Sequence, residues 1–366
     1  MQKGIMLALD NRHEIDSIGC DADTVPISPA PSITVCLCTH DRPGYARTCL
    51  AGLRHQTVGL DAFDTVVVDS CSGPAAAADL VAMVAALPNA RLVRLEELGI
   101  SRARNAAARA SGADYVAYID DDAIPAPDWI ERIRLAIIEA PRAPAVLSGR
   151  VLPIWEAPLP DWWPASLRGV LSIVEWNGRG EYRTPQVPQG LEPYGVNMVV
   201  DRAAMLALGG FDERLGRVGN VLLSDEDIQL AWRLQDLGRA VQYDARIVVH
   251  HQIQARRLTP EWLIERLYCQ GASTVVTRRL LGQHGLVRRE FPRRLMVEAL
   301  CEVASLVPMS SSLLIALRWR LAYARGFTRM ALGCHPRKRS LLLQARRLQI
   351  RKTENKPSVS QSPKST

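Results

Sequence analysis

The chain has 366 residues, which is enough for one large α/β domain with an appendage or for two domains. It is 48% hydrophobic but only 5% aromatic, so its core must consist mainly of Val, Leu, Ile and Ala. Residues 337–366 hold nine Lys and Arg residues against one acid, so this segment accounts for the whole net charge of +7, and the near-neutral remainder argues against a nucleic-acid-binding protein.

The composition also indicates a compartment. Residues 1–30 mix charged residues with Gly and Pro without a repeating pattern, which predicts a disordered leader rather than a signal peptide. No run reaches the roughly 18 consecutive apolar residues that a membrane-spanning helix needs, and eight cysteines in a chain of this length indicate no disulfide framework. We therefore expect a cytoplasmic protein, or one bound peripherally to the cytoplasmic face of the inner membrane.

Apolar runs alternate with helical patterns in the first third of the chain. Four runs have the length and β-branched content of buried strands, and a helical spacing of apolar residues follows the first three. The expected strands are residues 33–38, 65–68, 91–95 and 115–119. This alternation predicts an α/β fold with a Rossmann-like, mostly parallel sheet flanked by helices. Polar residues that end the strands, among them Asp41 and Asp69, should then gather along one edge of the sheet.

Three carboxylates, Asp120, Asp121 and Asp122, follow the fourth apolar run directly. Residues i and i+2 of an extended segment point the same way, so we expect Asp120 and Asp122 to converge and Asp121 to face elsewhere. Such a pair would repel unless a cation lay between its members, and its hard oxygen ligands suit Mg²⁺ or Mn²⁺. The alternative interpretation is a solvated acidic turn.

Two predicted helix starts carry charged residues. Gly99 precedes a helix whose first turns hold Arg102 and Arg104, which predicts an anion site or simply a solvated helix end. Glu226 and Asp227 lie in the first turn of another helix, where the helix dipole favours ionised carboxylates. Plain capping would account for that acidic pair equally well.

The second half holds two further features. Residues 155–176 are rich in Trp and Pro, which predicts either a lid over a site or a hydrophobic plug. A strand predicted over residues 242–251 ends in His250 and His251. Because adjacent residues of a strand face opposite sides, only one of these histidines can serve a site.

The chain from residue 260 onward is predicted to be helical, over residues 262–281, 291–307 and 311–332. The last of these helices mixes apolar residues with arginines, which suits a helix lying in a membrane interface. A helix packed on the preceding domain, with its arginines extending to solvent, fits the composition as well. Residues 334–366 are expected to form a basic, disordered tail.

Together these motifs resemble a family 2 glycosyltransferase with the GT-A fold. The resemblance is carried by residues 33–43, Leu53 to Gln56, Val66-Val67-Val68-Asp69, Gly99-Ile100-Ser101, Arg104-Asn105 and the Asp120–Asp122 triplet. The family usually has Thr-Tyr-Asn-Arg after the first strand and Asp-Asp-Gly-Ser after the second. Here the corresponding residues are Thr39-His40-Asp41-Arg42 and Asp69-Ser70-Cys71-Ser72, so one carboxylate is missing.

The resemblance implies a domain plan and a set of residue roles. A GT-A domain would span residues 31–260, with a nucleotide-binding half (31–130) and an acceptor half (131–260), followed by a helical extension (261–333). The resemblance implies that Asp41 and Asp69 bind the nucleoside, and that Arg104 contacts the phosphates or holds an aspartate in place. Asp122, with Asp120 and His251, would bind Mn²⁺ or Mg²⁺. Asp227, or else Glu226, would be the general base.

The implied activity is inverting transfer of a sugar from a nucleotide-diphosphate sugar to an acceptor hydroxyl. The acceptor would be a carbohydrate or a lipid-linked saccharide in surface polysaccharide or glycolipid biosynthesis, with peripheral contact to anionic membrane through the C-terminal helix and tail. Two other hypotheses remain open from the sequence. One is a sugar-nucleotide or nucleotidyl transferase with two metal ions, and the other is a non-catalytic carbohydrate-binding protein on a decayed transferase fold.

Overall fold

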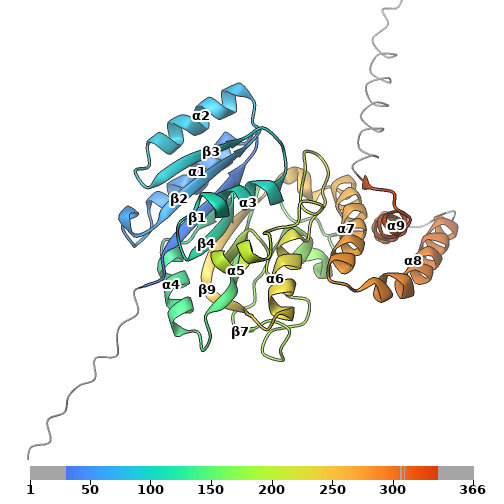
Figure 1. Cartoon of the computed structure of the whole chain (residues 1–366). Helices are drawn as coiled ribbons and strands as arrows, with labels where there is room; N and C mark the ends of the chain where they lie inside the picture. Colours follow the sequence, from blue (N-terminus) through green and yellow to red (C-terminus); the bar gives the residue numbers. More distant parts are fainter. Residues whose placement is uncertain (1–29, 306, 309, 337–366) are drawn as a thin grey trace, which may run out of the picture. The chain divides into compact units, whose positions relative to one another are not determined.

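The computed structural model describes residues 30–305, 307–308 and 310–336. The predicted leader thus lies outside the described residues except for residue 30, and so does the tail beyond residue 336. Within the described part, nine strands form one sheet in the order β3-β2-β1-β4-β8-β6-β9-β5, with β7 paired to β9 (Figure 1). The predicted α/β class is confirmed.

The first four strands of the chain are mutually parallel, because helices cross over between them. The strands are β1 (Ile33–Thr39), β2 (Asp64–Ser70), β3 (Ala90–Leu95) and β4 (Tyr115–Asp120). The connecting helices are α1 (Pro43–Arg54), α2 (Pro74–Ala85) and α3 (Ile100–Ala110). β1 pairs with both β2 and β4, and β2 pairs with β3. The carboxyl ends of β1, β2 and β4 therefore meet at one edge, where open α/β sheets bind ligands.

After β4 the sheet becomes mixed. The later strands are β5 (Ala123–Pro125), β6 (Pro144–Trp155), β7 (Arg179–Glu181), β8 (Asn197–Asp201) and β9 (Ala240–Ile253). β8 runs antiparallel to both β4 and β6, whereas β6 and β9 are parallel. The short strands β5 and β7 add antiparallel pairs to β9. Neither short strand was predicted, since three residues are too few to show an alternating pattern.

Helices and short 3₁₀ turns fill the connections of the second half. They are α4 (Trp129–Glu139), α5 (Arg202–Ala207), α6 (Glu226–Asp236) and the 3₁₀ turns η1 (Leu60–Ala62), η2 (Ala165–Leu171) and η3 (Ala255–Leu258). The predicted mostly aliphatic core is present: Val35, Leu37, Val66 and Val67 are fully buried. Trp129 is the largest of the fully buried side chains, and its indole N–H donates to Asn197 Oδ1 at 2.9 Å.

Three helices follow the sheet: α7 (Pro260–Leu280), α8 (His284–Ala304) and α9 (Ser311–Ala331). The sequence placed the middle helix at residues 291–307, but it begins at His284 and takes Pro292 into its interior. In the part of the chain that the structure describes, no helix combines the length and the apolar content needed to cross a bilayer.

Helix α9 packs on α7 through close backbone contact at two glycines. A Cβ at Gly326 would lie 1.8 Å from the carbonyl oxygen of Tyr268, and one at Gly271 would lie 2.1 Å from that of Tyr323. The second half of α9 is buried, with Phe327 fully enclosed. For this half of the helix the structure shows packing, and the partner is α7 of the predicted helical extension.

Replacing Gly326 with Ala should lower the free energy of unfolding by about 1–3 kcal/mol, because the new methyl group overlaps a backbone oxygen that cannot move freely. Gly285→Ala in α8 is the control, since nothing lies within 4 Å of the Cβ position there. Both substitutions raise helix propensity by a similar amount, so the difference between their unfolding free energies reports the contact between α7 and α9. Urea unfolding would measure it, and equal midpoints for the two variants would contradict the α7–α9 contact.

Candidate active site

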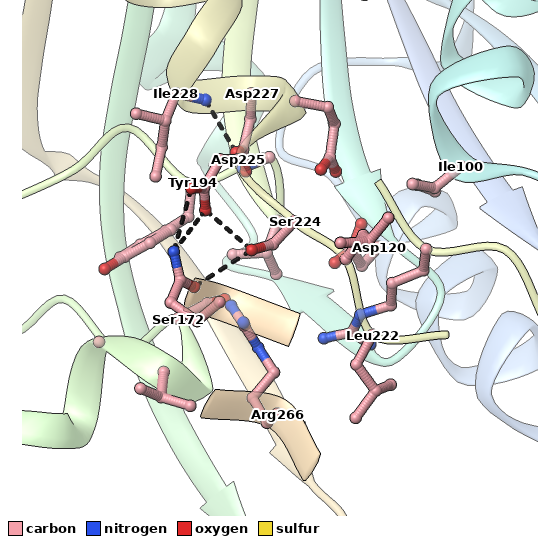
Figure 2. Close-up of a pocket in the computed structure, with 18 of the residues that line it drawn as sticks. Ile100, Asp120, Ser172, Tyr194, Leu222, Ser224, Asp225, Asp227, Ile228 and Arg266 are labelled. Carbon is pink, nitrogen blue, oxygen red and sulfur yellow. Dashed lines mark hydrogen bonds between the residues drawn. The ribbon is translucent and has the colours of Figure 1, made fainter. Parts of the chain in front are cut away.

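A pocket of about 1270 Å³ opens at the carboxyl edge of the sheet. Its walls come from the strand ends, from the loop and first turn of α6, and from the helices α7 and α9 (Figure 2). The predicted site residues that line it are Asp41, Arg104, Asp120, Glu226 and Asp227. Asp69, Asp122 and His251 are not in its lining. The site thus gathers residues from both halves of the predicted domain.

Arg104 links two carboxylates across this pocket. Its Nη2 lies 3.0 Å from Asp120 Oδ1 and its Nη1 lies 2.8 Å from Glu226 Oε1. The guanidinium lies directly over Gly195, where a Cβ would come within 2.5 Å of both Nη atoms. Any side chain at position 195 would force the Arg104 guanidinium to move. Of the two roles expected for Arg104, the structure places it in the one that holds carboxylates in position.

The two acidic residues of α6, Glu226 and Asp227, differ in their partners. Burial, and next the charge of Asp227, raise the pKa of Glu226 to about 7, against the opposing effect of Arg104. Asp227 instead accepts backbone N–H groups, from Gly195 at 2.6 Å and from Ile228 at 2.8 Å. In the described part of the chain no arginine hydrogen-bonds its carboxylate. Asp227 is thus oriented toward the pocket without being neutralised.

The predicted convergence of Asp120 with Asp122 is wrong. Strand β4 ends at Asp120, and the next two residues form a turn, so the alternation of an extended segment no longer applies. Instead Asp121 and Asp122 share Arg42, which bonds the Asp121 carboxylate through Nε at 3.1 Å and reaches Asp122 Oδ2 through Nη1 at 3.0 Å. Burial raises the pKa of Asp121 to about 7.

Asp122 is buried under four polar partners. Arg257 Nη2 lies 2.6 Å from its Oδ2 and Gln254 Nε2 lies 2.7 Å from the same atom. Burial raises the pKa of this carboxyl, but Arg257 and His251 outweigh that effect and hold the pKa well below its ordinary range. Arg257 and Gln254 follow His251 within one short turn, η3, which brings all three to this carboxylate.

His251 is buried beside Asp122. Its Nδ1 lies 3.1 Å from the carbonyl oxygen of Leu171, and its Nε2 lies 3.3 Å from Asp122 Oδ1. This is the histidine chosen from the adjacent pair in the sequence. Arg257 Nη1 also lies 3.3 Å from Nε2, which places a positive charge beside His251 and Asp122.

Of the three predicted metal ligands, Asp122 and His251 lie together. Asp120, predicted as a third ligand, is turned to Arg104, and within the described ranges no three His, Cys, Asp or Glu side chains come together as a metal site. Two protein ligands are enough for a cation that takes its other ligands from substrate phosphates and water, as Mg²⁺ commonly does. Such an ion would have to displace Arg257, whose guanidinium contacts both Asp122 and His251.

The two carboxylates expected at the nucleoside end differ in position. Asp41 lines the pocket, with its Oδ1 accepting from the Gly73 N–H at 2.7 Å. Asp69 is fully buried; it accepts from the Ser72 N–H at 2.9 Å and lies 3.4 Å from Arg94 Nη1. Asp69 thus shapes the turn after β2, whereas Asp41 faces the pocket.

Asp225 is a pocket residue that the sequence analysis did not assign. It adopts the left-handed conformation with φ of 73°, which is rare for a residue other than glycine. Gln270 Nε2 donates to its two oxygens at 2.9 and 3.0 Å, and Ser224 Oγ donates at 2.8 Å. Its position directly before Glu226 was visible in the sequence, but its strained backbone was not.

Comparison with known proteins agrees with this geometry. Residues 34–186 match the family model described as glycosyl transferase family 2. The chain is 31% identical over 203 residues to the glucosyl-dolichyl phosphate glucuronosyltransferase of Haloferax volcanii, covering 55% of this chain and 63% of that protein. It is 26% identical to the pre-mycofactocin glycosyltransferase of Mycobacterium tuberculosis, over 64% of this chain and 46% of the relative. The chain thus spans less than two thirds of the length of these relatives.

The fold is also that of a solved structure, the mannosyltransferase PcManGT from Pyrobaculum calidifontis in complex with GDP-Man and Mn²⁺. The TM-score is 0.53 at 20% identity, over 82% of this chain and 84% of that one.

Proposed function

Since this chain carries a family 2 glycosyltransferase domain on the GT-A fold, we propose that it transfers a sugar from a nucleotide-diphosphate sugar to an acceptor hydroxyl with inversion. The observation that supports this best is the unequal acidic pair at the pocket. Arg104 pairs with Glu226, while Asp227 faces the pocket with only backbone donors on its carboxylate. An inverting transferase needs one such base and no second nucleophile.

In the proposed reaction Asp227 accepts the proton of the acceptor hydroxyl as that oxygen bonds to the anomeric carbon. The bond from the anomeric carbon to the diphosphate breaks in the same step, and the nucleoside diphosphate leaves with the electron pair. The Gly195 and Ile228 N–H groups hold the Asp227 carboxylate in place. The Arg104 guanidinium keeps the adjacent Glu226 charge compensated.

We assign the donor to the sheet edge. Asp41 and Asp120, which line the pocket, would contact the nucleoside, with Asp69 shaping the turn behind them. Asp122 and His251 would hold Mn²⁺ or Mg²⁺, which would supply positive charge to the departing diphosphate. The relative solved as PcManGT contains GDP-Man and Mn²⁺, which supports this assignment of the donor end.

A thermal-shift screen tests the donor class directly. UDP-, GDP- and dTDP-sugars should be compared with and without Mn²⁺, because binding to the native state raises the melting temperature. We expect one nucleotide to stabilise the protein, and more strongly with the metal ion present. No shift with any nucleotide sugar would contradict the proposed donor.

We further propose that the protein contacts anionic membrane peripherally, at a surface we call the α8 outer face. The sequence assigned this contact to residues 311–332, but half of that helix is buried on α7. Helix α8 exposes Leu295, Met296, Leu300 and Val303, whereas the exposed large apolar residue of α9 is Leu313. Exposed arginines at 288, 289 and 293 accompany the apolar residues of α8. Of the acidic residues of α8, Glu290 is paired with Arg278, and Glu298 and Glu302 are paired with Arg325.

Vesicle flotation measures this contact. Wild-type protein should float with vesicles containing anionic lipid and be released by high salt, since each nearby arginine contributes about 1 kcal/mol that salt screens. Leu300→Glu with Val303→Glu should remove flotation. Ile138→Glu, at a residue of similar exposure on α4 (62% against 61% for Leu300), should not. Equal flotation of both variants would exclude the α8 outer face as the contact.

A further inference from the structure

Arg266, on α7, lies buried in the pocket wall with unused hydrogen-bond donors. The residue is 7% exposed, and its Nε and Nη1 have no hydrogen-bond partner in the described part of the chain. Figure 2 shows the side chain extending from α7 toward Asp225 and Ser224. The Asp225 carboxylate is already bonded by Gln270 and Ser224. A buried guanidinium is costly without acceptors for its N–H groups, so this arrangement indicates an anionic ligand.

A second guanidinium strengthens the positive charge at this point. Arg217 lines the same pocket, and burial, followed by the charges of Arg257 and Arg266, lowers the pKa of Arg217 to about 10. Arg257 is compensated by Asp122 at 2.6 Å. Within the described residues neither Arg217 nor Arg266 forms an ion pair with a carboxylate. Arg217 and Arg266 therefore interact with the surrounding carboxylates Asp120, Glu226 and Asp225 without a direct ion pair to any of them.

The pocket continues past Arg266 along an apolar wall. Its members are Leu167 and Val170 of η2, Trp262 and Leu267 of α7, and Trp319 and Tyr323 of α9. Most of them are only partly buried, and they pack against a buried cluster that includes Trp163 and Leu263. The Trp-rich segment thus acts as a plug at Trp163, while η2 faces the pocket. An anion-binding group and an apolar surface meet in one cavity.

We propose that Arg266, supported by Arg217, binds the phosphate of a lipid-linked acceptor whose chain lies along Trp262 and Trp319. This inference rests on the proposed function, since it names the acceptor class of the same pocket. Phosphate oxygens would accept hydrogen bonds from the free Nε and Nη1 donors of Arg266, and hydrogen bonds between two charged groups are the strong ones. In the proposed function the donor diphosphate lies near Asp122 and His251, which are outside the lining of this cavity, so Arg266 within the lining is left for a second anion.

Isothermal titration with decyl phosphate, kept below the concentration at which it forms micelles, tests the subsite without requiring turnover. Wild-type protein should bind decyl phosphate. Inorganic phosphate, which lacks the alkyl chain, and decanol, which lacks the phosphate, should bind more weakly. Arg266→Gln should weaken decyl phosphate binding about 10- to 100-fold, the usual effect of losing hydrogen bonds to a charged group. Arg266→Lys should recover part of the affinity, and Arg54→Gln, an exposed change on α1, should leave it unaltered.

Titration with UDP and GDP separates the two phosphate sources. Their affinity should be unchanged in Arg266→Gln; a loss there, with decyl phosphate binding intact, would overturn the proposal by assigning Arg266 to the donor. Equal binding of inorganic and decyl phosphate would overturn the lipid part. Should Arg266→Gln fail to fold, Arg217→Gln carries the same expectation at a smaller loss. Decyl phosphate binding that depends on Arg266 in a protein that turns over no nucleotide sugar would support the subsite and refute the proposed function.

Discussion

Replacing Asp227 with Asn is expected to lower kcat by about 10²–10⁴-fold, the usual contribution of a general base. The amide keeps the shape of the carboxylate but cannot accept the proton of the acceptor hydroxyl. The two Asp227 oxygens accept separate N–H groups, from Gly195 and from Ile228, so the amide nitrogen of Asn would leave one of these donors unpaired. We therefore expect a loss of about 1–3 kcal/mol of stability, with donor binding nearly unchanged. Initial rates at saturating donor, together with a melting curve, would measure both effects.

Glu226→Gln provides the contrast for that experiment. Glu226 and Arg104 form a buried pair at 2.8 Å, with exposed side-chain fractions of 8% and 5%. Removing one charge of such a pair typically costs about 3–5 kcal/mol of stability. We therefore expect Glu226→Gln to lower the melting temperature more than Asp227→Asn does. A stable Glu226→Gln variant with the larger loss of kcat would reverse the assignment of the base.

Asp122→Asn is expected to abolish the response to Mn²⁺ and to destabilise the protein together. The sequence alone predicted loss of activity in an intact fold. The structure corrects this expectation, because Asp122 compensates Arg257 and Arg42 in the buried wall behind the pocket. Breaking that group should cost about 3–5 kcal/mol. The contribution is fully present above the ordinary pKa of 3.8 and is lost as the pH falls through the lower folded pKa.

Asp128→Asn is a control for Asp122→Asn. Its partner is Arg132 at 2.7 Å, and both side chains are more than one third exposed, so the change should have little effect on stability. Donor binding would be titrated with and without Mn²⁺ in both variants. Undiminished stimulation by Mn²⁺ in Asp122→Asn would remove this carboxylate from the metal site.

Much of the fold followed from local patterns. The parallel strands of the first half and most helices were predictable because aliphatic runs and 3.6-residue spacing report burial directly. The position of His251 at the end of a strand was equally visible. The sequence could not show that β4 stops at Asp120, because a turn inside a run of three identical residues leaves no pattern, and the pairing expected from strand alternation failed there.

The ion pairs that organise the site were harder to predict from the sequence, since they join residues far apart in the chain. Arg104 and Glu226 are separated by 122 positions, and Arg257 and Asp122 by 135. The sequence around an arginine does not show which carboxylate it will pair with in the folded protein. For the same reason the free donors of Arg266 could not be anticipated: a lack of partners becomes visible only when the surrounding residues are in place.

The central claim is best tested by the configuration of the product. The transfer reaction would be followed by NMR, with the nucleotide sugar that stabilises the protein, Mn²⁺ and a lipid-linked saccharide acceptor. The account predicts release of the nucleoside diphosphate, a product whose anomeric configuration is opposite to that of the donor, and loss of both with Asp227→Asn. Retained configuration, or release of inorganic diphosphate in place of the nucleoside diphosphate, would contradict it.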